Sequence, residues 1–238
     1  MKMLSEEEAQ VPAPSKLLLA MEARVWGEMA HYAVARGALK RLPRGDGHAV
    51  LVIPGFGATD FSTAPLRRAL NELGYQALGW EQARNLGMRS GLRDALNARV
   101  CDLAGRHGKI TLIGWSLGGV FAREMARHQP DCVRRVITLG SPFNGHPDAN
   151  NMLRLVKLAN GGKAPKMDWA GFQRRRVPPP VPCTAIHSKT DGIVAWQCSV
   201  EEAAPNTENI EVQGSHFGLC VNPKVIRVIA DRLARDAQ

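Results

Sequence analysis

One serine in this chain stands in a setting that suits covalent catalysis. Ser116 is the centre of a G-x-S-x-G pattern, Gly114-Trp115-Ser116-Leu117-Gly118. The apolar run 109–113 before it predicts a strand, and residues 120–127 behind it predict a helix. A strand, a tight turn and a helix form a nucleophile elbow, where glycines at 114 and 118 avoid collisions with neighbouring backbone. The pattern therefore predicts that Ser116 attacks an acyl carbonyl.

A serine hydroxyl is a weak nucleophile, so this prediction requires a base and an acid that orients the base. Asp191 and His216 follow the serine in chain order. Residues 182–187 predict a short buried strand before the turn that holds Asp191, and residues 210–212 predict another before the loop that holds His216. Open α/β sheets carry functional groups beyond the carboxyl ends of their strands. We therefore expect the serine, the aspartate and the histidine to meet at one edge of a sheet.

Other residues compete for these roles. Asp191 could act only as a turn former, because aspartate hydrogen-bonds the backbone of its own turn. Asp148 and Asp168 also follow the serine, but in a segment that we expect to be solvated. His187 is the competing base; it precedes Asp191, which is the wrong order, and its alternative is a packed core histidine. The remaining histidines, at positions 31, 48, 107, 128 and 146, are scattered, and none of them has metal-ligand spacing to another histidine or to a cysteine.

These motifs resemble the α/β-hydrolase superfamily, in particular its esterase and lipase branch. The resemblance rests on residues 114–119, 188–194 and 214–218, and on the apolar strand 50–53 that breaks into Pro54-Gly55-Phe56-Gly57. Lipase-like members usually have His-Gly at this turn, and here Pro54 replaces the histidine. The resemblance implies an α/β fold: a mostly parallel central sheet flanked by helices, with a helical cap or lid as an insertion.

The resemblance also implies a chemistry. Ser116 attacks the acyl carbonyl, His216 takes its proton, and Asp191 holds the imidazole. The backbone N–H groups of Phe56 and Leu117 would line the oxyanion hole. We expect an esterase or lipase that acts on apolar acyl esters without a metal or organic cofactor. A thioesterase or acyltransferase with the same triad is one alternative, and a catalytically silent module that binds a lipid or a partner is another.

Two segments lie outside the minimal hydrolase core. Residues 1–48 are predicted to be an N-terminal extension with an amphipathic helix from Ser15 to about Arg36. Its apolar stripe favours packing on the same chain, and the alternative is an interfacial helix that lies on a membrane surface or on a partner. The stripe comprises Leu18, Met21, Val25, Met29 and Tyr32. Residues 49–238 are predicted to form the hydrolase domain. Its cap, at about 142–182, would hold an apolar helix near 152–158 and the aromatic surface of Trp169 and Phe172.

Composition narrows the class of partner. The net charge of +9 would suit nucleic acid, but no nucleic-acid module is visible, and 5% aromatic residues offer little stacking surface. We therefore expect no nucleic acid, and at most a weak attraction to an anionic lipid surface. Five widely spaced cysteines and an N-terminus without a signal-peptide pattern predict reduced thiols and a cytoplasmic location.

Overall fold

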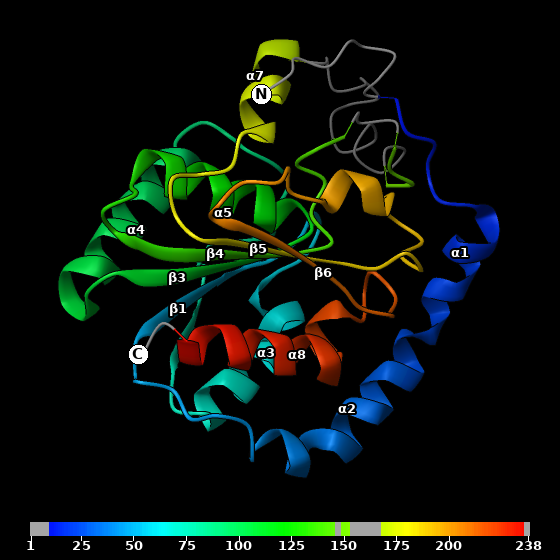
Figure 1. Ribbon diagram of the computed structural model, residues 1–238, viewed down its shortest axis with the longest axis horizontal. Helices are drawn as coiled ribbons and strands as arrows, with labels where there is room; N and C mark the ends of the chain where they lie inside the picture. The colour runs from blue at the N-terminus through cyan, green and yellow to red at the C-terminus, as the bar shows by residue number, and fades with distance from the viewer. Residues whose placement is uncertain (1–9, 146–148, 153–167, 236–238) are drawn as a thin grey trace.

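In the part of the chain that the structure describes, six parallel strands form one sheet in the order β2-β1-β3-β4-β5-β6 (Figure 1). The computed structural model describes residues 10–145, 149–152 and 168–235. The strands are β1 (Ala49–Ile53), β2 (Gln76–Gly79), β3 (Ile110–Trp115), β4 (Val133–Leu139), β5 (Cys183–His187) and β6 (Thr207–Glu211). Every neighbouring pair is parallel. The predicted α/β class with a parallel sheet is confirmed.

Helices cover both faces of the sheet, which explains why the central strands are continuous apolar runs. On β1, Val50 and Val52 point into one core, and Ala49, Leu51 and Ile53 point into the other. The first core is closed by α2 (Val25–Leu39), α3 (Asp60–Glu72) and α8 (Pro223–Arg235), and the second by α4 (Leu92–His107) and α5 (Leu117–His128). None of the described helices combines the length and apolarity needed to cross a membrane.

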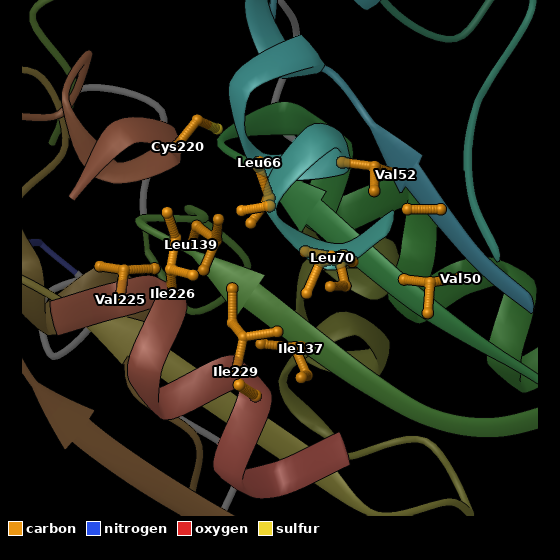
Figure 2. Close-up of a cluster of buried hydrophobic side chains, with 14 of the residues drawn as sticks. Val50, Val52, Leu66, Leu70, Ile137, Leu139, Cys220, Val225, Ile226 and Ile229 are labelled. Carbon is orange, nitrogen blue, oxygen red and sulfur yellow. The ribbon is translucent and has the colours of Figure 1, made fainter. Parts of the chain in front are cut away.

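The first core holds α8 against the sheet. Figure 2 shows Val225, Ile226 and Ile229 of this helix gathered with Leu66 and Leu70 of α3. All five side chains are fully buried. They come from one face of each helix, so both helices are amphipathic and bury their apolar face against the sheet.

Replacing Ile229 with alanine should lower the free energy of unfolding by about 2–5 kcal/mol, because the substitution leaves a cavity in a closed core. Ile229→Val should cost only about 1 kcal/mol. Urea denaturation followed by circular dichroism measures both. Val34→Ala is the matched control, since Val34 is 85% exposed; an equal loss of stability in that variant would contradict the assignment of this core.

The N-terminal segment departs from its prediction. The single helix expected from Ser15 is three pieces, α1 (Lys16–Ala20), the 3-10 turn η1 (Met21–Arg24) and α2. The expected apolar stripe is partly wrong: Tyr32 is buried, but Met21 and Met29 are 41% and 44% exposed. Glu22 and Glu28 face the domain instead, because backbone N–H groups there satisfy their carboxylates.

Of the predicted cap, the structure describes residues 142–145, 149–152 and 168–182, and the helix within these residues is α7 (Trp169–Arg176). Phe172 is buried and stacks against Trp169, so the pair does not form the expected aromatic surface. The guanidinium groups of Arg123 and Arg127 on α5 donate to the carbonyl of Arg175 at 2.8 and 3.0 Å. These bonds attach the end of α7 to α5. The apolar helix predicted near 152–158 lies outside the described residues, apart from Met152.

Candidate active site

Ser116 lies at the junction of β3 and α5, where the elbow was predicted. Its backbone has φ 54° and ψ −125°, a conformation that is strained for a residue with a side chain. The N–H of Ser116 donates to the carbonyl of Leu139 at 2.8 Å and ties the turn to β4. A Cβ on Gly114 would overlap the backbone of Gly119, and one on Gly118 would overlap the carbonyl of Ile53. The glycines therefore have the steric role that the sequence predicts.

The predicted acid and base form a buried pair. Nδ1 of His216 lies 2.7 Å from Oδ2 of Asp191, and both side chains are 2% exposed. Oδ1 of Asp191 accepts the N–H groups of Ile193 and Val194, both at 2.8 Å. The two bonds orient the carboxylate, so its second oxygen faces the imidazole. With Nδ1 donating to Asp191, Nε2 is the nitrogen that can accept a proton.

Ser116 and His216 line the same cavity, which has a volume of about 300 Å³. Phe56 and Leu117, the residues predicted for the oxyanion hole, line it as well. The other lining residues are mainly apolar and include Leu86, Met88, Pro142, Met152 and Phe217. The structure thus brings together the predicted serine, histidine and oxyanion residues, with the aspartate buried behind the histidine.

The turn that carries Phe56 is held against the elbow by a buried asparagine. Nδ2 of Asn85 donates to the carbonyl of Pro54 at 2.8 Å, and the carbonyl of Asn85 accepts the N–H of Gly57 at 2.6 Å. A Cβ on Gly55 would lie 3.0 Å from that of Ser116, so the turn passes close to the serine. Sequence reasoning missed Asn85, because a single asparagine in a loop carries no signal of its distant partner.

The N–H groups of Phe56 and Leu117 are available to a ligand. Leu117 is the first residue of α5, and the first N–H groups of a helix have no partner within it. Among the hydrogen bonds of the described residues, neither N–H donates to a protein acceptor. Both residues border the cavity beside Ser116. The arrangement can therefore offer two donors to an oxyanion that forms at the serine.

A family model described as alpha/beta hydrolase fold matches residues 43–164, which is more than half of the chain. The chain belongs to this family. No curated protein sequence matches it.

Solved structures of similar fold include lipases and esterases. LipS and LipT, described as metagenome-derived lipolytic enzymes, give a TM-score of 0.61 at 17% identity over 82% of this chain and 96% of theirs. The monoacylglycerol lipase of Paleococcus ferrophilus gives 0.60 at 15% identity over 82% and 97%. Est1E from Butyrivibrio proteoclasticus gives 0.54 at 17% identity over 82% and 89%. At such identities the similarity shows that this hydrolase-fold chain shares their architecture.

The environment of His216 favours its charged form. Burial lowers the pKa of the imidazole, but the charge of Asp191, the hydrogen bond to it and the charge of Glu22 raise it further. The pKa of His216 therefore lies above its ordinary value. Nε1 of Trp115 also donates to the carbonyl of His216 at 3.0 Å, so the elbow holds the histidine loop directly. The G-x-S-x-G pattern names Trp115 but does not reveal this bond.

The competing residues have other environments. His187 is buried and stacks on Trp196, and burial lowers the pKa of its imidazole. His187 is not among the residues that line the cavity of Ser116. Asp168 is exposed, as expected, and it caps α7, where its side chain accepts the N–H of Gly171 at 2.9 Å. Asp148 lies outside the described residues.

Proposed function

We propose that this protein is a serine carboxylic-ester hydrolase that acts on apolar acyl esters through Ser116, His216 and Asp191. One observation carries the proposal: a buried histidine, paired with an oriented carboxylate, borders the same cavity as a serine on a strained elbow. A serine with only a structural role would not require this strained backbone conformation. Its cost in free energy is offset by the surrounding packing.

The reaction follows from these positions. Oγ of Ser116 attacks the acyl carbonyl while Nε2 of His216 takes its proton, and Asp191 stabilises the imidazolium. The N–H groups of Phe56 and Leu117 donate hydrogen bonds to the oxyanion. Leu117 begins α5, so the positive end of the helix dipole adds to the stabilisation that its N–H provides. His216 then protonates the leaving alcohol. Water cleaves the acyl-enzyme with His216 again as the base.

The shape and lining of the cavity favour an apolar acyl group. Leu86, Met88, Met152 and Phe217 present carbon-rich surface, and the described lining residues include no aspartate, glutamate, lysine or arginine. Phe217 and Met88 remain 42% and 38% exposed, so the opening is apolar too. The volume of about 300 Å³ is small for a binding pocket, which favours short and medium acyl chains.

Hydrolysis of p-nitrophenyl esters from acetyl to palmitoyl tests the proposal. We expect turnover that is highest at short or medium chain length. Faster turnover of acyl-CoA than of the matching ester would indicate that the protein is a thioesterase. Transfer of the acyl group to an added alcohol would indicate that it is an acyltransferase. Absence of all turnover, together with no labelling of Ser116 by a fluorophosphonate, would indicate a silent binding module.

The ratio kcat/KM should rise with pH, with a midpoint above about 6.5, the ordinary pKa of histidine. The sign follows from the roles: only neutral His216 can accept the serine proton, and its raised pKa keeps it charged to higher pH. Initial rates with one ester between pH 5 and 9 give the midpoint. A flat profile over this range, or a midpoint below the ordinary value, would argue against His216 as the base.

A further inference from the structure

The N-terminal segment places two carboxylates against the loop that carries His216. Oε1 of Glu22 accepts the N–H of His216 at 3.0 Å, and Oε2 accepts that of Phe217 at 3.1 Å. Glu28 accepts the N–H of Ser215 at 2.8 Å and its hydroxyl as well. Three consecutive N–H groups of the loop therefore donate to residues 187 to 195 positions away in the chain. Glu22 and Glu28 together therefore bind the backbone of this loop.

Glu22 also reaches the loop of the catalytic acid. Its Oε1 accepts the N–H of Gly192 at 2.7 Å, directly after Asp191. One buried carboxylate, in a residue 5% exposed, thus joins the backbone next to Asp191 to the backbone of His216. The 2.7 Å bond between the two side chains depends on the relative position of both loops, and Glu22 links the backbones of these loops.

Close packing along the segment supports a specific fit. A Cβ on Gly192 would overlap the carbonyl of Leu18, and one on Gly218 would overlap the carboxylate of Glu28. Glycine at both loops permits this approach. The 3-10 turn η1 interrupts the helix at Glu22, and a short 3-10 stretch within a helix changes the direction in which side chains point.

The charges around His216 reinforce the geometry. Asp191 faces it from the loop after β5, and Glu22 faces it from η1. Glu28 of α2 binds the neighbouring Ser215, and the guanidinium of Arg24 lies 3.7 Å from Glu28 and donates to the carbonyl of Thr190. Of these groups, Asp191 and Glu22 are the ones whose charges raise the pKa of His216. An imidazolium formed during catalysis is therefore stabilised from two sides.

We propose that Glu22 is a positioning residue of the active site, which holds the loops of Asp191 and His216 in register and stabilises the imidazolium. The inference rests on the proposed function for its catalytic consequence. It makes the N-terminal segment a working part of the site, although this segment precedes the hydrolase core in the chain. Glu22 acts through His216 and is not among the residues that line the described cavity.

The test compares Glu22→Gln with Glu72→Gln in the full chain. Glutamine keeps the size of the side chain but removes its charge and turns one acceptor into a donor that faces an N–H group. We expect kcat for p-nitrophenyl butyrate to fall about 10- to 100-fold with KM within about twofold, since loosened geometry weakens the transition state. Glu72 is the matched control because it pairs with Arg36 of α2 and joins the same segment to α3, away from His216.

The pH dependence gives a second measurement that a purely structural role would not change. We expect Glu22→Gln to move the midpoint of kcat/KM to lower pH, because one of the charges that raise the pKa of His216 is gone. Glu22→Asp keeps the charge and should recover part of this shift. Wild-type kcat and midpoint in Glu22→Gln would overturn the inference, and so would an equal loss in Glu72→Gln.

Direct titration of the His216 imidazole by NMR separates this inference from the proposed function. If the wild-type protein hydrolyses no ester, the proposed function fails, and the titration alone tests the role of Glu22. An unchanged pKa of His216 in Glu22→Gln would then overturn the inference, and a lowered pKa would support it. If Glu22→Gln does not fold, Glu22→Asp replaces it, since its shorter side chain cannot reach all three N–H groups. Wild-type kcat in that variant would overturn the inference.

Discussion

Replacing Ser116 with alanine should abolish ester hydrolysis and leave the fold intact. The substitution removes the attacking oxygen, and we expect kcat to fall by about 10⁴- to 10⁶-fold, as for other serine hydrolases that lose their nucleophile. Alanine keeps the Cβ of serine, so the strained backbone at φ 54° is no worse accommodated. Initial rates with p-nitrophenyl butyrate measure the loss, and thermal unfolding checks the fold.

The control for this variant is Ser62→Ala, on the half-buried side of α3 and outside the cavity. It should keep wild-type rates and wild-type labelling by a fluorophosphonate probe. The probe should label the wild-type protein at Ser116 and leave Ser116→Ala unlabelled. Undiminished hydrolysis by Ser116→Ala would show that a different group attacks the ester and would end the proposed mechanism.

Asp191→Asn should lower kcat by about 10⁴-fold, because it favours the wrong tautomer of His216. The hydrogen bonds around Asp191 determine how an asparagine side chain at this position would be oriented. Oδ1 of Asp191 accepts two N–H groups, from Ile193 and Val194, and an amide oxygen can keep that position. The amide NH₂ must then face Nδ1 of His216, which becomes an acceptor. The proton moves to Nε2, where it faces the serine and blocks proton transfer.

Asp168→Asn is the matched control, because Asp168 also follows the serine in the chain and caps α7. Asparagine is a good helix cap, so this variant should keep both stability and kcat. The measurement is kcat for the two variants at a pH above the midpoint of the wild-type profile. Near-normal activity in Asp191→Asn would mean that another acid orients His216.

The sequence by itself determined the elbow, the order of the three candidate catalytic residues and several of the strands, and its resemblance to the α/β-hydrolase superfamily implied that the sheet is mostly parallel. Each depends on local pattern: glycines beside Ser116 where backbone crowds the turn, and apolar runs of five or six residues for strands covered on both faces. Such patterns need no knowledge of what lies opposite.

Only the tertiary structure decided how the site is supported. Asn85 holds the turn of Phe56 through the carbonyl of Pro54, and its partner is 31 residues away. Glu22 and Glu28 face inward, although Met21 and Met29 of the same segment are exposed. This is the opposite of the usual amphipathic pattern, in which apolar side chains face the core and charged side chains face solvent. A carboxylate can be buried wherever N–H donors meet it. Those donors come from loops near residues 192 and 216, far away in the chain, so the periodicity of the N-terminal segment cannot reveal them.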